Sequence, residues 1–175
     1  RDRVYTCYYR TSSEGQFPMR CVRTANDAYL WNPWSDGVAE YKAENMSGLS
    51  WKAMLKAAEA DSALKRRTEF YLHRAPEEYY DDSKDAAERS NRIDELSCRA
   101  RIEALRADLQ AHLQRTGDPL ADLFRQRDSK EALTRYRKQL SDEAAGRKAE
   151  KKERREGKAS AAAKPKEEPV KAPAG

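Results

Sequence analysis

The sequence has no run of the roughly 20 apolar residues that a membrane-spanning helix needs, so a transmembrane protein is excluded. Charged residues make up 37% of the 175 residues and hydrophobic residues 38%, which places the chain at the polar edge of what can bury a core. One modest folded unit followed by polar, unfolded sequence is the expectation from this balance.

Cysteine and histidine are scarce, and their spacing indicates no metal site. Cys7, Cys21 and Cys98 are separated by 14 and 77 residues and include no Cys-x-x-Cys pair. Of the two histidines, His73 closes a predicted helix and His112 follows a leucine stripe. Each is interpreted as a boundary or surface residue rather than a catalytic one.

Signatures of nucleophilic and phosphate chemistry are also missing. No serine lies in a Gly-x-Ser-x-Gly elbow, and no glycine-rich phosphate loop occurs. The acidic residues Asp81, Asp82 and Asp85 lack the alternating ligands and the glycine of a calcium loop. Turn formation is therefore the favoured interpretation of this acidic cluster.

The net charge of +5 comes entirely from the C-terminal end of the chain. Residues 146–175 hold 10 lysines and arginines against 5 glutamates, whereas residues 1–145 carry 25 charged residues of each sign. A nucleic-acid surface needs a basic stripe on a folded face, so nucleic acid is not an indicated partner.

Hydrophobic patterns predict four short strands and a helical insertion. Three strands joined by hairpins fall within residues 1–34, where aromatic and β-branched runs alternate with turn residues, and the fourth covers 77–81. Residues 50–72 have helical periodicity, with a break near Asp61-Ser62.

A long helix is predicted from residue 93, and its apolar stripe consists of Ile93, Leu96, Ala100, Ile102, Leu105, Leu109 and Leu113. The segment 116–119 stops this helix with a glycine and a proline, and 120–124 supplies one more packed turn. We expect the stripe to pack on the inner face of the sheet, against Val22 and either Tyr79 or Tyr80.

These elements predict an α+β fold, in which a small antiparallel sheet of about four strands packs against one long helix and a helical insertion. Three regions are expected: a folded unit over 1–124, a charged helix-prone extension over 125–157 and a disordered low-complexity tail over 158–175. The aromatic residues near the N-terminus exceed what so small a core needs, so we expect some of them to form an exposed patch.

Four segments carry a resemblance to a known family. They are Phe17–Thr24 (FPMRCVRT), Tyr29–Gly37 (YLWNPWSDG), Arg74–Asp81 (RAPEEYYD) and Leu113–Pro119 (LQRTGDP). Together they resemble the C-terminal region of the sulfatase family, with the heparan N-sulfatase (sulfamidase)-like enzymes as the nearest branch. The match extends over residues 3–124, and the shared order of the four motifs makes it specific.

The resemblance implies that this chain holds no catalytic or metal-binding residue. Sulfatases use a formylglycine, made from the Cys or Ser of a C/S-x-P-S/A-R motif, and a divalent cation, usually calcium, in a larger N-terminal domain. Neither Cys7 nor Cys21 nor Cys98 lies in that motif. The chain, which opens on Arg1, would then be a fragment that is inactive by itself. Its parent would be a periplasmic or secreted enzyme that hydrolyses sulfate esters or N-sulfates of a sulfated glycan.

The same resemblance places the loop before the second strand at the substrate cleft. Where some family members have a His-Glu pair, this sequence has Tyr9, Arg10 and Thr11, which are therefore the candidate cleft residues. The Arg10 guanidinium suits a substrate sulfate or carboxylate, and the alternative is a merely solvated hairpin end. Another class of function also stays open: a small α+β binding module whose basic tail docks on nucleic acid or an acidic partner.

Overall fold

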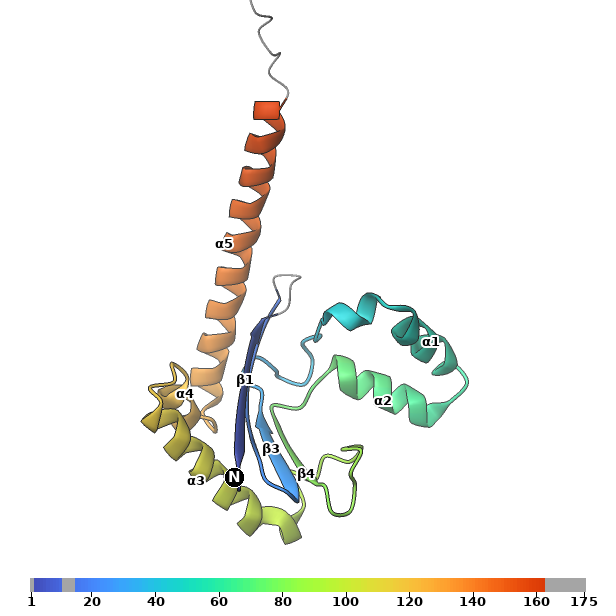
Figure 1. Ribbon diagram of the computed structural model, residues 1–175, viewed down its shortest axis with the longest axis vertical. Coiled ribbons are helices and arrows are strands. Elements are labelled where there is room, and N and C mark those ends of the chain that lie inside the picture. Colours follow the sequence, from blue (N-terminus) through green and yellow to red (C-terminus); the bar gives the residue numbers. More distant parts are fainter. Residues whose placement is uncertain (1, 11–14, 163–175) are drawn as a thin grey trace, which may run out of the picture.

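The computed structural model describes residues 2–10 and 15–162, with side chains up to residue 154. Its four strands form one antiparallel sheet in the order β1-β2-β3-β4: β1 Val4–Arg10, β2 Gln16–Arg23, β3 Asp27–Trp31 and β4 Glu77–Asp81. Helices cover this sheet (Figure 1). The predicted α+β fold with a small antiparallel sheet is confirmed.

The helices are η1 Glu44–Ser47, α1 Leu49–Ala57, α2 Ser62–Leu72, η2 Leu96–Cys98, α3 Arg99–Arg115, α4 Ala121–Arg125 and α5 Lys130–Ala162. The predicted insertion consists of α1 and α2, and its break falls at Asp61, whose Oδ1 accepts hydrogen bonds from the first backbone N–H groups of α2. Of the tail predicted over 158–175, the part up to Ala162 is helical and the rest lies outside the described residues. Across the described chain, no helix combines the length and apolarity that a membrane span requires.

Helix α3 begins later than the sequence pattern predicts. Leu96 lies in the preceding turn η2 with 84% of its surface exposed, and the helix starts at Arg99. The cause is a competing set of hydrogen bonds at the edge of β4. Asn91 Oδ1 accepts from the N–H of Tyr79 at 2.9 Å, and the N–H of Arg92 donates to Tyr79 O at 2.9 Å. Residues 91 and 92 thereby satisfy the backbone N–H and C=O of Tyr79 on the open edge of β4, and the helix cannot start there.

The remaining stripe of α3 forms the main core. Its members Ile102, Leu105, Leu109 and Leu113 are 1–2% exposed and pack with Val22, Tyr29, Trp31 and Tyr79 of the sheet. Tyr79 is thus the sheet partner, whereas Tyr80 points to the opposite face. Phe124 of α4 closes this core edge-on to Trp31, with 4.9 Å between ring centroids, which confirms the further packed turn.

The opposite face of the sheet lies toward α1, α2 and the loop after β4 (Figure 1). Cys21, Ala28 and Tyr80 on that face are buried. The expected exposed aromatic patch is not formed, because most of these rings are buried in the packing on the two faces of the sheet. The buried members are Phe17, Tyr29, Trp31 and Trp34. Of these four aromatic residues and the three tyrosines of β1, only Tyr9 is exposed, at 48%.

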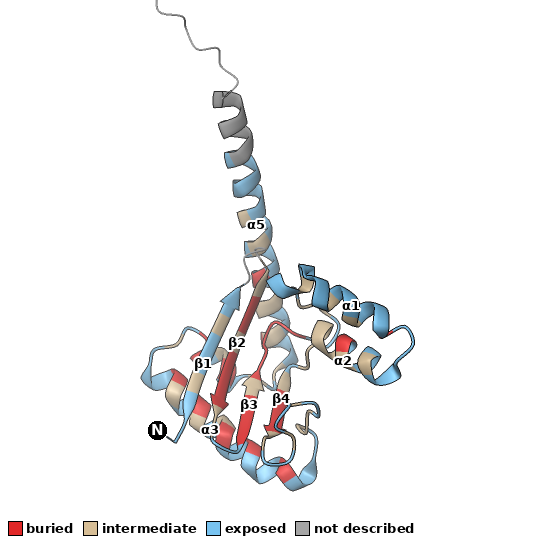
Figure 2. Cartoon of the chain, turned by 45° about the vertical axis from the view of Figure 1, so that its right-hand side comes forward, coloured by how far each residue is buried: buried red, intermediate tan, exposed pale blue. Residues whose placement is uncertain are grey.

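Helix α5 starts as part of the folded unit and then leaves it. Ala132 and Leu140 are buried, and Gln16 Nε2 of β2 donates a hydrogen bond to Leu140 O at 3.1 Å. The packed unit therefore continues past residue 124, where the sequence placed its end. The later turns of α5 project away from the sheet, and those up to residue 154 are largely exposed (Figure 2).

Candidate functional site

A buried ion pair joins β2 to the end of α3. Arg20 is 1% exposed, and its Nε and Nη2 donate to the two carboxylate oxygens of Asp118 at 2.8 and 3.0 Å. Gly117, at φ 64°, ends α3 in the left-handed conformation, and the N–H of Asp118 then donates to Leu113 O at 2.9 Å. This turn holds the carboxylate of Asp118 against the sheet.

The same guanidinium supports the end of the β1–β2 hairpin. Arg20 Nη2 donates to the Tyr9 hydroxyl at 2.8 Å, and the guanidinium carbon lies 4.5 Å from the centre of the Tyr9 ring. The strands form a bulge here, since Phe17 and Pro18 oppose Tyr9 alone, and a bulge tolerates the missing N–H of proline. Tyr9 is therefore held in place although its ring is partly exposed.

A second buried network joins β3 to β4 on the other face of the sheet. Glu78 is fully buried, and its Oε1 accepts from Asn32 Nδ2 and Arg74 Nε at 2.7 Å each. Its Oε2 accepts from the Tyr80 hydroxyl at 2.6 Å. Burial alone would lower the pKa of Arg74, but the hydrogen bonds and the charge of Glu78 raise it. The carboxylate is thus paired rather than available for chemistry.

The two networks link the four sequence segments Phe17–Thr24, Tyr29–Gly37, Arg74–Asp81 and Leu113–Pro119 in two pairs. Arg20 and Asp118 come from the first and last of these segments, Asn32 from the second and Glu78 from the third. These four polar side chains therefore stabilise the sheet and the turn after α3.

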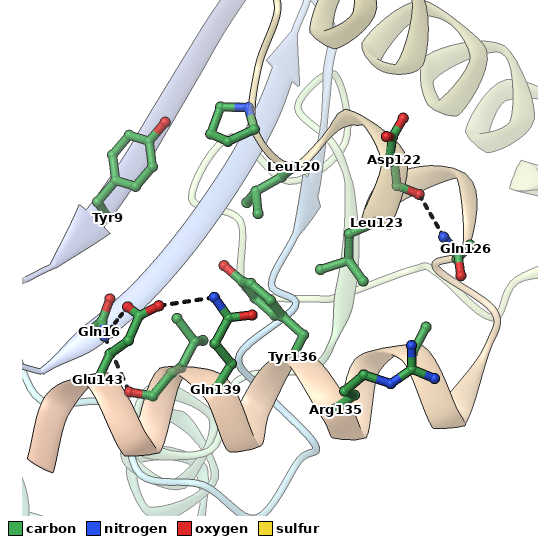
Figure 3. Close-up of a pocket in the computed structure, with 13 residues that line it drawn as sticks. Tyr9, Gln16, Leu120, Asp122, Leu123, Gln126, Arg135, Tyr136, Gln139 and Glu143 are labelled. Atoms are coloured by element: carbon green, nitrogen blue, oxygen red, sulfur yellow. Dashed lines mark hydrogen bonds between the residues drawn. The ribbon is translucent and has the colours of Figure 1, made fainter.

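A pocket of about 500 Å³ opens beside Tyr9, and we call it the hairpin pocket (Figure 3). The pocket is lined by Tyr9, Gln16, Pro119, Leu120, Asp122, Leu123, Gln126, Ala132, Arg135, Tyr136, Gln139, Leu140 and Glu143. Figure 3 shows Tyr9 on β1 at one side, Leu123 on α4 at the other, and Tyr136 and Glu143 along α5. The pocket is thus built by the hairpin, the turn after α3 and both following helices.

The polar groups of the hairpin pocket include amides, hydroxyls and a tethered carboxylate. Glu143 accepts hydrogen bonds from Gln139 Nε2 at 2.9 Å and from Gln16 Nε2 at 3.1 Å, and these bonds hold its pKa below the usual range. Burial raises the pKa of Tyr136 to about 12, so its hydroxyl stays protonated at neutral pH. These groups can hydrogen-bond the hydroxyls of a ligand, but they do not pair a nucleophile with a base.

The three predicted cleft residues do not share one environment. Tyr9 lines the hairpin pocket. Arg10 is exposed at the end of β1 and forms no ion pair with any carboxylate of residues 2–10 and 15–154. Thr11 lies outside the described residues. Of the two candidates that the structure describes, Tyr9 lines the pocket and Arg10 does not.

Sequence reasoning missed the contribution of α5 to this pocket, because 125–157 was assigned to a separate extension. The signal was present, since Leu133, Tyr136 and Leu140 recur at helical spacing and all pack against the core clusters. This apolar stripe is short and the residues around it are charged, so the segment was interpreted from its overall charge rather than from the stripe.

The other sequence candidates hold local structure. His73 Nδ1 lies 2.8 Å from a backbone carbonyl oxygen, and His112 stacks on Tyr5 with 3.7 Å between ring centroids. Asp85 Oδ2 accepts from two backbone N–H groups of its own turn, and Asp81 pairs with an arginine at 2.9 Å. Asp85 thus has the predicted role in a turn, whereas Asp81 and Asp82 form ion pairs with Arg92 and Arg23. No group of three or more potential metal ligands occurs within the part of the chain that the structure describes.

No model of a known protein family matches the chain, and no curated protein matches its sequence. Its function must therefore be inferred from its own residues and their contacts.

Proposed function

We propose that this chain is the C-terminal, non-catalytic subdomain of a sulfatase-like or sulfamidase-like hydrolase, and that it lines one wall of the substrate cleft. The parent enzyme would hydrolyse sulfate esters or N-sulfates of a sulfated glycan. The observation that carries the proposal is that each of the four motif segments supplies a side chain to one of two buried polar networks, Arg20 with Asp118 on one face of the sheet and Glu78 with Asn32 on the other. Conserving such residues would therefore keep the strands and the end of α3 in place, as a structural subdomain requires.

The framework also explains how a non-catalytic subdomain could assist a reaction. Arg20 supports Tyr9 from the buried side, and Arg10 follows directly at the exposed end of β1. A strand end fixed in this way can present a guanidinium to an anionic group without a large cost in side-chain ordering. We assign Arg10 the contact with a sulfate or carboxylate of the glycan.

The proposed partner is an N-terminal catalytic domain of the same protein. That domain would contain the formylglycine and the calcium ion, since the four motif segments use their polar groups for structure. The outer edge of β1 supports this arrangement, because no described strand pairs with it and Val4 on it is 46% exposed. An open edge strand is a ready surface for pairing with a second domain.

The isolated 175-residue chain should show no sulfatase activity, because the proposed nucleophile and metal ligands belong to the other domain. Release of sulfate from an aryl sulfate is the measurement, with boiled protein as the control. The full reading frame, by contrast, should encode a C/S-x-P-S/A-R motif upstream of Arg1 and yield an active enzyme. Turnover by the isolated chain, or a stop codon just upstream of Arg1, would refute the proposal and favour an independent binding module.

The cleft contact is tested in that full-length enzyme with Arg10→Ala. We expect about a ten-fold loss of kcat/KM on a sulfated oligosaccharide and little change on a small aryl sulfate, because only the larger substrate reaches the hairpin. Lys52→Ala is the matched control, since this lysine is exposed on α1, away from the hairpin. Equal effects of Arg10→Ala on both substrates would contradict a cleft-lining role.

A further inference from the structure

A second, larger pocket lies between α2 and the loop 83–90, and we call it the insertion groove. Its volume is about 820 Å³. Leu64, Phe70 and Ala87 give it apolar surface, and Arg66, Arg67 and Arg89 give it three guanidinium groups. The groove is separate from the hairpin pocket, because the two share no lining residue.

The loop wall of the groove is held in a defined shape. Glu88 has a φ of 48°, which is unusual for a residue other than glycine. Its carboxylate pairs with Arg23, and its carbonyl oxygen accepts from Arg67 Nη1 at 3.1 Å. Asp85 Oδ2 accepts from the N–H of Arg89 at 2.6 Å. These contacts position the loop, so the backbone that carries Arg89 does not have to be ordered by a ligand.

The charge of the groove is only partly balanced by its own lining, which has three arginines and one acid. Most arginines near the sheet pair with carboxylates: Arg20, Arg23, Arg74, Arg92, Arg101 and Arg106. Among the described residues, however, no carboxylate forms an ion pair with Arg66, Arg67 or Arg89. The one acid that lines the groove, Asp61, uses its Oδ1 to cap α2. Guanidinium groups that have no carboxylate partner and gather on one concave surface favour an anionic ligand.

We propose that the insertion groove binds sulfate or carboxylate groups of an anionic glycan. The guanidinium groups would pair with the anions, and the CH faces of a sugar ring would lie on Leu64 and Ala87. A nucleic acid fits less well, because the groove has one aromatic ring, Phe70, which already has the Arg74 guanidinium 5.3 Å from its centre, whereas single strands stack successive bases on several rings. The choice of a glycan rests on the proposed function, whereas the anion site rests on the groove alone.

The test measures binding of a short heparin-derived oligosaccharide to the full chain by calorimetry, with its desulfated form as the uncharged probe. Arg66→Gln/Arg89→Gln should weaken binding of the sulfated probe by about ten-fold or more. Lys52→Gln/Lys56→Gln is the matched control, because it removes the same charge from the exposed surface of the neighbouring helix. We expect the control to weaken binding less than about two-fold. All four residues are exposed, so both variants should keep the wild-type thermal transition.

Equal losses in the two variants would show that only overall charge matters and would overturn the site. A single-stranded oligonucleotide could also bind as tightly as the glycan and lose this binding in the same arginine variant. That result would overturn the glycan assignment. The proposed function is judged separately, by sulfate release from the full-length enzyme. If the full-length enzyme releases sulfate but its affinity for the glycan is unchanged by Arg66→Gln/Arg89→Gln, only the groove site is overturned.

Discussion

Leu109→Asp is expected to unfold the protein. Leu109 is 1% exposed and lies in the core between α3 and the sheet. The substitution removes a buried leucine side chain, which alone costs about 2 to 5 kcal/mol, and it places a charged carboxylate in an apolar core. Small domains have only about 5 to 15 kcal/mol of stability, so the folded state should be largely lost.

Leu96→Asp is the matched control for this prediction. Both leucines belong to the stripe that the sequence predicts, but Leu96 is 84% exposed in the structure. Its substitution should change the free energy of unfolding by less than about 0.5 kcal/mol. Circular dichroism and urea denaturation of the two variants measure the difference. If Leu96→Asp unfolds the protein as well, α3 starts earlier than the structure shows.

Asp118→Ala is expected to destabilise the protein by about 3 to 5 kcal/mol, because it leaves the buried guanidinium of Arg20 without its carboxylate. The turn after α3 would also lose a hydrogen bond, since Asp118 Oδ1 accepts from the N–H of Leu120 at 2.8 Å. The proposed role of Arg20 beneath Tyr9 predicts that the hairpin becomes more mobile in this variant, which hydrogen exchange of β1 and β2 would report.

An exposed ion pair one turn later provides the comparison. Arg125 and Asp122 form an i, i+3 pair on α4, with side-chain exposures of 56% and 80%. Asp122→Ala should therefore cost no more than about 1 kcal/mol. Chemical denaturation of both variants separates the two cases. A similar small loss for Asp118→Ala would mean that the Arg20 pair does not support the fold, and it would weaken the proposed framework.

Several elements were predictable because they depend on near neighbours in the sequence. The strand at 77–81, the break at Asp61 and the helix stop at Gly117 follow from turn and capping chemistry within a few residues. The faces of α3 follow from its period, which is why the burial of Leu105, Leu109 and Leu113 was predicted correctly.

The start of α3 and the Arg20–Asp118 pair were not predictable in this way, because both depend on contacts with residues outside the local pattern. Leu96 has the spacing of a core residue, but Asn91 and Arg92 bond to the edge of β4 and delay the helix. Arg20 and Asp118 are 98 residues apart and meet only because the turn after α3 faces β2. No local pattern contains either contact.

The sequence by itself determined the α+β class, the four strands and the amphipathic helix, because these depend on periodicity and turn chemistry along the chain. Only the tertiary structure decided that α5 joins the core, that Tyr9 lines a pocket and that Arg66 and Arg89 share a groove. Each of these features is built from segments that are distant in sequence. Their proximity arises from the packing of whole elements on the two faces of the sheet, which no local period encodes.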